Sequence, residues 1–384
     1  MRKIIFILVV SIILLTGIVY IRSQNKNISP PQVAKFSEEP TLTQKMGQKS
    51  TDKIPSIEVI AENLDTPWGM AFLPDGSMLV TERPGRVRLI DNEGNLNKLP
   101  VATLNEVKEI GEGGLLGIIL HPDFSTNNFL YIYYTYAEDN NQTLNKIVRM
   151  TYKDAKLTQE TTIVDKIPGA PNHNGGRIKF GPDQYLYITT GDAQEPSQAQ
   201  DTDKLGGKVL RVTDTGDPAP GNPFNNLVYS YGHRNPQGLA WDDKGRLWAT
   251  EHGRSGLQSG LDEINLITAG KNYGWPEIQG DEQKEGMEKP QLHSESDTWA
   301  PAGSAFINNS LFFGGLRGET LYEAIIKDNQ ITLKEHFKKE FGRIRDVVIG
   351  RDGMLYITTS NRDGRGSPET SDDKIIKINS STFN

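Results

Sequence analysis

The chain has 384 residues and a formal net charge of −7 at pH 7, with 38 glycines, 21 prolines and no cysteine. The acidic balance argues against nucleic acid as a partner, because no basic excess is available to neutralise phosphates. The lack of cysteine excludes disulfides, thiolate metal ligands and cysteine nucleophiles. Abundant glycine and proline indicate many turns, which is typical of an all-β protein.

The N-terminal segment differs in composition from the rest of the chain. Arg2 and Lys3 precede an almost unbroken apolar run from Ile4 to Ile21. A positive start followed by an apolar run indicates a signal peptide or a signal anchor over residues 1–22, and about 18 apolar residues are just enough to span a bilayer. We therefore expect the remainder of the chain to be extracytoplasmic, and to be either membrane-anchored by the N-terminal segment or secreted.

The next segment, residues 23–54, is polar, contains prolines and shows no sustained periodicity. A segment of this composition cannot bury enough apolar surface to fold, so we predict a disordered linker. The folded domain is expected over residues 55–384.

Similar units recur along the folded domain. Each has an apolar strand, a polar turn and a second strand that often ends in threonine, as in "GMAFLPDGSMLVTE" and "RIKFGPDQYLYITTG". The turns fall at or near Asp75, Asp123, Asp183, Lys244, Asn309 and Asp352. Units spaced by roughly 40 to 65 residues fit four-stranded antiparallel blades that close into a ring. The sequence therefore predicts a six-bladed β-propeller, whereas the alternative, a two-sheet sandwich, gives no reason for a repeat.

The repeat also predicts which residues meet in space. Each turn joins two antiparallel strands, so the residues that enter the first strand and leave the second share the opposite end. In a propeller the first strand lines the central channel, so these entry residues should converge on one mouth of it. They are Trp68, Glu112, His173, Arg234, Asn235, Arg343 and Arg345, and the second strands end on the same face in "TERPGR", "TTGDA", "ATEHGR" and "TSNRDGRG".

His173 and the arginines of this set suggest a general base beside an anion-binding site. A histidine titrates near neutrality and can remove a hydroxyl proton, and guanidinium groups bind carboxylates through paired hydrogen bonds. A structural role is the alternative for His173 alone, but its shared phase with Arg234, Arg343 and Arg345 favours a functional one. His121, in contrast, falls in a turn at the opposite face, where we expect a structural role.

Several ordered motifs resemble one known family. They are "GEGGLLGIILHPDF", "HNGGRIKFGPD", "YGHRNPQGLAW", "LDEINLITAGKNYGWPEI" and "GGLRGETLY". On these motifs the chain is similar to the soluble glucose/sorbosone dehydrogenases, especially the aldose sugar dehydrogenases that use pyrroloquinoline quinone (PQQ). The resemblance implies a six-bladed propeller quinoprotein. It also implies oxidation of the anomeric C1 hydroxyl of aldose sugars to lactones, with hydride transfer to calcium-bound PQQ.

The resemblance implies roles for individual residues. His173 matches the catalytic base, which takes the proton of the anomeric hydroxyl. The positions that match cofactor-contacting residues are Glu112, Arg234, Asn235, Arg317, Arg343 and Arg345. Of these, Arg343 and Arg345 match the pair that holds the carboxylates of the cofactor, and Arg317 takes a position where the family carries a basic side chain.

The resemblance also implies calcium. Backbone oxygens of Gly253 and Arg254 match the ligands of an ion that polarises the quinone, and Glu263 and Tyr273 match the surroundings of a second ion. Oxygen ligands suit calcium, which would act as a Lewis acid. Blade packing and turn formation are the alternative explanation of the motifs that hold Glu263 and Tyr273.

Two features depart from the family pattern. Relatives usually carry glutamine where this chain has Glu112, and the loop "HGRSGLQSGLDE" after the second strand of its blade is longer and contains Arg254. Two other functions therefore stay open: a non-catalytic sugar-binding or adhesion propeller, and a metal-dependent lactonase-type hydrolase. As an enzyme, the chain would need an aldose substrate and an electron acceptor that the sequence does not identify, with membrane contact only through the N-terminal segment.

Overall fold

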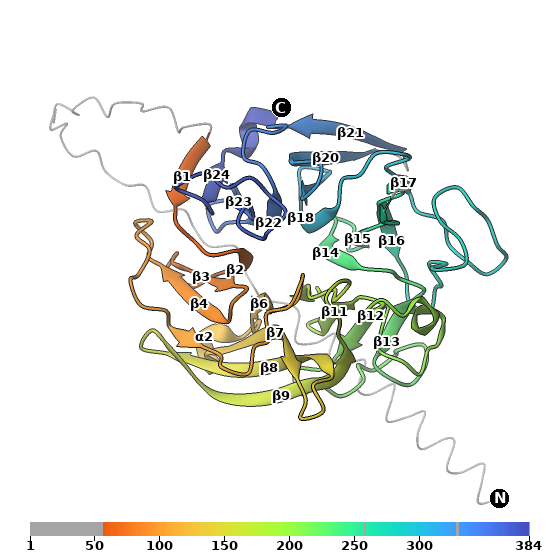
Figure 1. The fold of residues 1–384 in the computed structure, drawn as a ribbon, viewed down its shortest axis with the longest axis horizontal. Coiled ribbons are helices and arrows are strands. Elements are labelled where there is room, and N and C mark those ends of the chain that lie inside the picture. Colours follow the sequence, from red (N-terminus) through yellow and green to blue (C-terminus); the bar gives the residue numbers. More distant parts are fainter. Residues whose placement is uncertain (1–56, 257–258, 328–329, 384) are drawn as a thin grey trace, which may run out of the picture. The chain divides into compact units, whose positions relative to one another are not determined.

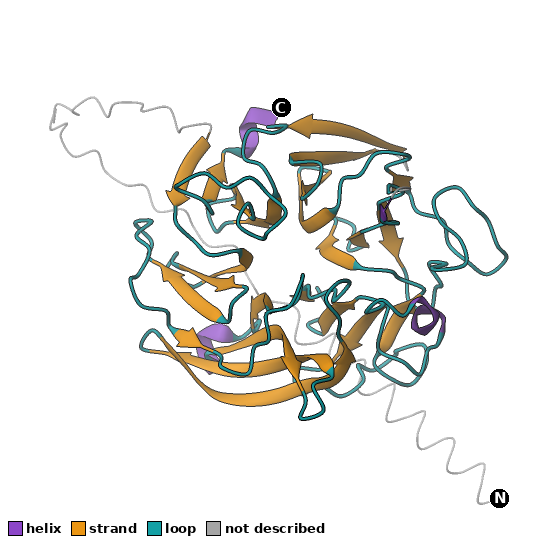
Figure 2. Cartoon of the chain, viewed as in Figure 1, coloured by secondary structure: helices purple, strands orange, loops and turns teal. Residues whose placement is uncertain are grey.

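The computed structural model describes residues 57–256, 259–327 and 330–383. The predicted signal segment (1–22) and linker (23–54) lie outside these residues. Within the described residues the helices are short, namely α2 (Phe124–Asn127), η1 (Pro196–Gln200) and η3 (Ser380–Phe383), as Figure 2 shows. None of them is long and apolar enough to cross a membrane.

The strands form six four-stranded antiparallel sheets arranged in a ring (Figure 1), which we number as blades in chain order. Blade 1 holds β2 (Pro67–Phe72), β3 (Met78–Glu82), β4 (Arg86–Ile90) and β5 (Ala102–Thr103); blade 2 holds β6 (Leu115–Leu120), β7 (Phe129–Ala137), β8 (Thr143–Lys153) and β9 (Lys156–Pro168). Blade 3 holds β10 (Ile178–Phe180), β11 (Leu186–Thr190), β12 (Lys208–Val212) and β13 (Val228–Tyr231); blade 4 holds β14 (Pro236–Trp241), β15 (Leu247–Glu251), β16 (Glu263–Ile267) and β17 (Leu292–His293). Blade 5 holds β18 (Pro301–Ile307), β19 (Ser310–Gly315), β20 (Thr320–Lys327) and β21 (Gln330–His336); blade 6 holds β22 (Ile344–Ile349), β23 (Leu355–Thr359) and β24 (Ile375–Ile378), and β1 (Ile57–Ala61) is its outermost strand.

The predicted six-bladed propeller is confirmed. Ring closure comes from β1, which pairs antiparallel with β24, so that the first and last described strands share one blade. The predicted turns also lie between the first and second strands of the blades. At the first of them the Asp75 carboxylate accepts hydrogen bonds from the Ser77 N–H (3.0 Å) and hydroxyl (2.6 Å), and Gly76 has φ +92°, a conformation that glycine adopts without strain.

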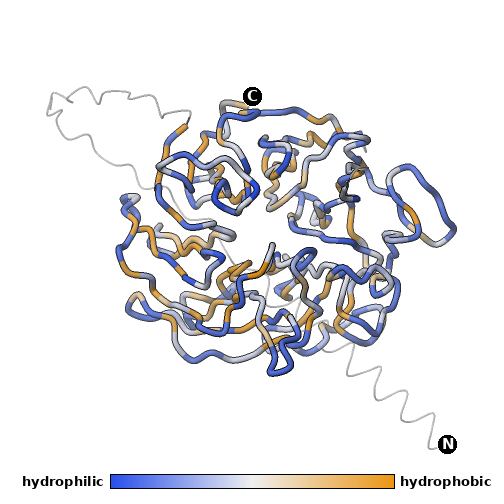
Figure 3. Tube along the Cα trace, in the orientation of Figure 1, coloured by the Kyte–Doolittle hydropathy of each residue, from blue (hydrophilic) through white to orange (hydrophobic). Residues whose placement is uncertain are grey.

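The core lies between the blades. Every residue of β3, β11, β15 and β23 is buried, because each of these second strands is covered by a neighbouring blade on both faces. Figure 3 shows hydrophobic segments within the blades, and a largely hydrophilic loop between β16 and β17. The second strands therefore form a rigid support for the loops that follow them.

A register shift recurs near the start of the inner strands. It occurs between Pro67 and Gly69 in β2, and between Pro236 and Gly238 in β14, with equivalents in β6, β18 and β22. Such bulges redirect side chains. Here they accompany Trp68, Gln237 and Arg345, which are buried and which we call the neck of the channel. Arg345 contacts the other two residues: its Nη1 donates to Gln237 Oε1 at 2.6 Å, and its guanidinium lies 5.7 Å from the Trp68 ring centroid.

Lys208 is a buried cation in blade 3. Its side chain has no exposed surface, and its Nζ lies within hydrogen-bond distance of the carbonyl oxygens of Gln198 (2.7 Å), Ala199 (3.2 Å) and Gly206 (2.6 Å). Burial lowers the pKa of Lys208 to about 7, whereas three acceptors call for the three protons of an ammonium group. The side chain thus ties η1 to the start of β12.

Replacing Lys208 with methionine should lower the free energy of unfolding by about 1–3 kcal/mol, because it leaves buried carbonyl groups without a donor. Urea unfolding of the two proteins measures this difference. The exposed Lys204 offers the control, and its methionine variant should unfold with the wild-type midpoint. Equal midpoints for Lys208→Met and wild type would show that the carbonyl contacts do not stabilise the blade.

Candidate active site

One mouth of the channel holds a polar cavity of about 440 Å³. Its lining includes Glu112, His173, Arg234, Arg317 and Arg343, which the sequence predicted to converge there or to contact a cofactor. Gly253 and Arg254 also line it, together with Asn172, Gln194, His252, Ser255, Asp262 and Arg365. Strand-entry residues of different blades therefore meet at one mouth of the channel, as predicted. Asn235, Arg345, Glu263 and Tyr273 do not line this cavity.

His173 lies in the loop between β9 and β10 with its ring partly exposed. Its φ is +62°, a left-handed conformation that is uncommon for a residue with a side chain and that concentrates at functional sites. Its backbone N–H donates to Glu112 Oε2 at 3.2 Å, and its carbonyl oxygen accepts from the Ala193 N–H at 3.1 Å. These two hydrogen bonds stabilise the unusual backbone conformation of His173.

Asp192 orients the ring of His173. Its Oδ1 lies 2.8 Å from His173 Nδ1, and its Oδ2 accepts a hydrogen bond from Trp275 Nε1 at 2.9 Å. The preceding residue must be small, because a Cβ on Gly191 would lie 1.9 Å from the His173 carbonyl oxygen. Asp192 is a candidate site residue that was not singled out from the sequence, although it lies in "TTGDA", one of the strand exits predicted at this mouth.

Glu112 is compensated by a cation that was also not predicted. Arg365, in the loop after β23, places its Nη1 2.5 Å from Glu112 Oε1 and donates through Nη2 to Asn172 Oδ1 at 2.8 Å. Burial raises the pKa of Glu112, but His252 and Arg365 outweigh it and lower the pKa to about 2. Burial lowers the pKa of His252 to about 3, so His252 is neutral at pH 7 and Arg365 carries the compensating charge. Glu112 is therefore an ionised carboxylate that forms a salt bridge with Arg365.

Replacing Arg365 with glutamine should change how stability depends on pH. In the wild type, the lowered pKa of Glu112 contributes stability that is fully present above its usual pKa and is lost as the pH falls towards 2. Without Arg365 the pKa rises, so the loss begins at a higher pH. Melting temperatures measured from about pH 3 to pH 7 test this. Arg317→Gln serves as the comparison, because it removes a different cation from the same mouth. Parallel pH curves for Arg365→Gln and wild type would contradict the pairing.

Arg234 and Asn235 come from the loop before β14. The Arg234 Nη2 donates to Ser255 Oγ at 2.8 Å, and its guanidinium lies 5.2 Å from the Trp275 ring centroid. Burial lowers the pKa of Arg234. Asn235 Oδ1 accepts from the Gly175 N–H at 2.9 Å, which fixes the loop that carries His173.

Arg343 and Arg345 lie at different depths. Arg343 lines the cavity and donates through Nε and Nη2 to Asp363 Oδ2 at 3.0 and 2.7 Å. The pKa of Asp363 is lowered, although burial raises it, because Arg343 and Arg345 outweigh burial. Arg345 lies at the neck, where burial lowers its pKa to about 9. Asp363 was not singled out from the sequence, although it lies in "TSNRDGRG", one of the strand exits predicted at this mouth.

The loop of Gly253 and Arg254 is organised by Asp262. Asp262 Oδ1 accepts from the Gly253 N–H at 2.8 Å, and its Oδ2 accepts from the N–H groups of Trp299 and Ala300 at 2.6 and 2.9 Å. Of the two acidic residues in "LDEINL", Asp262 lines the cavity and Glu263 does not, as expected for neighbours near the start of a strand.

Glu263 and Tyr273 lie apart from the cavity. Glu263 Oε2 accepts from Asn265 Nδ2 at 3.0 Å, and the same amide lies 3.4 Å from Glu251 Oε2. Burial and the charge of Glu251 raise the pKa of Glu263 to about 8. The Tyr273 hydroxyl donates to the Leu266 carbonyl at 2.6 Å. In the described chain no three His, Asp or Glu side chains are grouped as they would be around a metal ion.

Donor groups without partners gather around the cavity and the neck. Among the described residues, the buried side-chain polar atoms without a hydrogen bond include Arg234 Nε, His252 Nε2 and Arg254 Nε in the cavity lining, Arg345 Nε at the neck, and Asn235 Nδ2, which follows Arg234 in the loop before β14. Buried polar groups are normally paired, and four of these five nitrogens are obligatory donors. The site therefore fits a ligand rich in acceptor oxygens.

Comparison with known proteins places the chain in a family. A family model described as Glucose / Sorbosone dehydrogenase matches residues 64–369. The aldose sugar dehydrogenase YliI of Escherichia coli (strain K12) is 33% identical over 342 residues, which are 80% of this chain and 91% of that protein. The PQQ-bound structure of aldose sugar dehydrogenase from Streptomyces coelicolor is 41% identical with a TM-score of 0.78, and the match covers 84% of this chain and 98% of that one.

A six-bladed propeller with a histidine and several arginines at one mouth is thus a sugar-dehydrogenase architecture. The chain belongs to the glucose/sorbosone dehydrogenase family, and it is accordingly an enzyme of the oxidoreductase class.

Proposed function

We propose that the chain oxidises the anomeric C1 hydroxyl of aldose sugars to lactones, with PQQ as the hydride acceptor. The observation that carries this proposal is the His173–Asp192 pair (2.8 Å) beside a cavity whose lining includes three buried nitrogens without hydrogen-bond partners, on Arg234, His252 and Arg254. The likeness to a PQQ-bound aldose sugar dehydrogenase supports it.

The residues present fit PQQ, which carries three carboxylates and an ortho-quinone. Arg234, Asn235, Arg343 and Arg345 would hold it, because guanidinium and amide groups donate to carboxylate and carbonyl oxygens. Glu112 does not exclude an anion, because Arg365 compensates its charge. When bound, PQQ supplies a two-electron group that accepts hydride.

His173 acts in this proposal as the general base. Its Nδ1 lies against the Asp192 carboxylate, so we assign the ring proton to Nδ1. The lone pair of Nε2 is then the acceptor for the sugar hydroxyl proton, and the carboxylate stabilises the imidazolium that forms. Trp275 and the N–H of Gln194 donate to Asp192 at 2.9 Å each and hold it in place.

We also propose two calcium sites. Backbone oxygens of Gly253 and Arg254 would hold one ion, which would act as a Lewis acid towards the quinone. The second would lie near Glu263 and Tyr273, where Glu251 and Glu263 bracket the amide of Asn265 and a divalent cation would offset their repulsion.

Removing calcium with a chelator should therefore lower the melting temperature, because an ion that binds only the folded state stabilises it. In Glu263→Gln the calcium-dependent rise in melting temperature should be smaller than in wild type. Glu285→Gln, which changes an exposed carboxylate in the same blade, should keep the full rise. An unchanged rise in Glu263→Gln would reject the second site.

The setting of the reaction is also a proposal. The apolar segment from Ile4 to Ile21 favours export, with the enzyme either anchored by that segment or secreted. An extracytoplasmic dehydrogenase would pass its electrons to an acceptor outside the cytoplasm. Artificial redox dyes can take the place of that acceptor in an assay.

The test is an assay of the purified full chain with an artificial electron acceptor. Aldose-dependent reduction that requires added PQQ and calcium is the expected result. Absence of PQQ binding would favour the non-catalytic sugar-binding propeller. Hydrolysis of lactones without PQQ would favour the lactonase-type hydrolase.

A further inference from the structure

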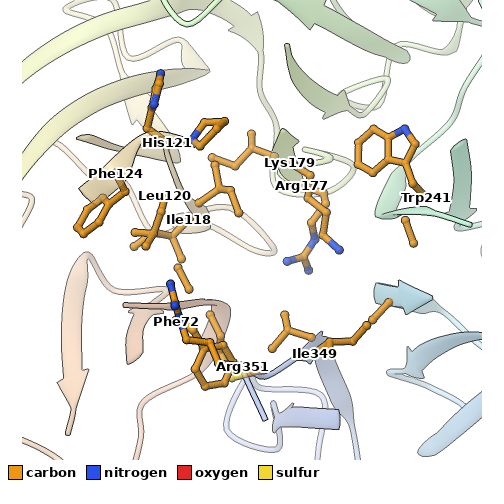
Figure 4. Close-up of a pocket in the computed structure, with 18 of the residues that line it drawn as sticks. Phe72, Ile118, Leu120, His121, Phe124, Arg177, Lys179, Trp241, Ile349 and Arg351 are labelled. Atoms are coloured by element: carbon orange, nitrogen blue, oxygen red, sulfur yellow. The ribbon is translucent and has the colours of Figure 1, made fainter. Parts of the chain in front are cut away.

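A second cavity, of about 520 Å³, lies at the opposite mouth of the channel (Figure 4). The inner strands that begin near the candidate active site end here, with Phe72, Leu120, Trp241 and Ile349 as their last residues. These side chains make much of the wall apolar. A volume of this size is typical of sites for small molecules.

The charged side chains that line this cavity are all basic. Its lining contains Arg177, Lys179 and Arg351, together with His121, and no aspartate or glutamate among the described residues. The chain as a whole carries a net charge of −7. An apolar cavity with only basic groups is therefore a local departure from the character of the protein, and it favours an anion.

Arg177 supplies an unused donor. Its side chain is only 4% exposed, Nη1 pairs with Asp346 Oδ1 at 2.9 Å, and Nε donates to the Gln237 carbonyl at 2.9 Å. Nη2 is buried and has no hydrogen-bond partner. Figure 4 shows the guanidinium directed towards the middle of the ring of lining side chains. Stacking of the guanidinium on Trp68, 4.4 Å from the ring centroid, keeps it in this orientation.

Lys179 adds a positive charge that no acidic side chain contacts directly. Its Nζ donates to the Ser304 carbonyl at 2.8 Å, which uses one of the three protons of an ammonium group. Burial and the nearby Arg177 lower the pKa of Lys179 to about 8. The negative charge of an anion in the cavity would raise the pKa of Lys179 and so favour its charged form. Asp346 offsets one of the two cations, so Arg177, Asp346 and Lys179 together keep a positive charge.

We propose that this cavity binds a small organic anion with an apolar body, whose charged group accepts hydrogen bonds from Arg177 Nη2 and Lys179 Nζ. The apolar body would pack against Phe72, Leu120 and Trp241. The site is separated from the candidate active site by the neck, so the proposal does not depend on the reaction proposed above.

Fluorescence titration of the purified full chain with anilinonaphthalene sulfonate (ANS) tests the proposal. We expect saturable binding of one ANS, displacement by decanoate, and no displacement by decanol, which has the same chain without the charge. Lys179→Gln should weaken ANS binding about tenfold or more, as expected for loss of a charge-assisted contact. Lys244→Gln is the matched control, because Lys244 lies in the turn after Trp241 but does not line the cavity.

A second pair of variants tests the proposal even if Lys179→Gln fails to fold. Ile349 is 38% exposed at the rim of the cavity, so Ile349→Asp and Ile349→Asn should both fold, as their melting temperatures will show. The carboxylate should weaken ANS binding several-fold relative to the neutral amide of the same shape. Absence of ANS binding, displacement by decanol as strong as by decanoate, or equal affinity in both Ile349 variants would overturn the proposal.

Discussion

Replacing His173 with asparagine should reduce aldose oxidation by about 10²- to 10⁴-fold, the usual contribution of a general base, while PQQ affinity changes little. Asparagine is the right substitution because His173 has φ +62° and asparagine tolerates the left-handed conformation better than alanine does. The loop should then keep its hydrogen bonds to Glu112 and Ala193. The measurement is turnover with an artificial electron acceptor, together with a PQQ titration of the same variant.

Two further variants separate catalysis from structure. His293→Asn, in β17 and away from the cavity, should retain wild-type turnover. Asp192→Asn should bind PQQ but shift the pH profile of turnover, because the amide no longer stabilises the imidazolium. Substantial turnover in His173→Asn would show that another group removes the proton.

Replacing Arg343 with glutamine should damage both folding and cofactor binding. The Asp363 side chain is only 3% exposed, and its Oδ2 accepts two hydrogen bonds from Arg343, so the substitution leaves a buried carboxylate without its salt-bridge partner. We expect the free energy of unfolding to fall by about 3–5 kcal/mol. PQQ affinity should fall about tenfold or more, through loss of a charge-assisted contact.

The double variant Arg343→Gln with Asp363→Asn distinguishes the two effects. Removing the carboxylate should restore much of the lost stability, because no unpaired charge remains. It should not restore PQQ affinity, because the guanidinium is still absent. Urea unfolding and PQQ titration of the single and double variants measure the two quantities. Wild-type PQQ affinity in the double variant would contradict a role for Arg343 in holding the cofactor.

The repeat in the sequence was sufficient to predict the blades. A turn such as that at Asp75 depends on local chemistry, and the alternation of an inner and a second strand determines which residues share an end of the channel. This is why Glu112, His173 and Arg343, far apart in the chain, were correctly expected at one mouth. The position of a residue within its strand can be read locally, and the repeated blade topology then places equivalent positions at the same end of the channel.

Strand phase did not predict how deep in the channel a side chain lies or which residues it contacts. Arg345 was expected at the mouth together with Arg343 as a strand-entry residue, but it lies at the neck beside a register shift in β22. Asp192, Asp363 and Arg365 lie in strand exits that were predicted at this mouth, but no period in these loops indicates which side chains make contacts. Their roles arise from contacts between blades, such as the one between Arg365 and Glu112, which are 253 positions apart.

The most direct test of the proposed oxidation is a single turnover without any electron acceptor. The purified full chain is loaded with PQQ and calcium and mixed with an aldose, and the lactone is quantified beside the absorbance change of the cofactor. We expect one lactone for each PQQ reduced, and no lactone from His173→Asn loaded to the same extent. PQQ that stays oxidised in the presence of every aldose tried, although it is fully bound, would contradict the assignment of this propeller as an aldose dehydrogenase.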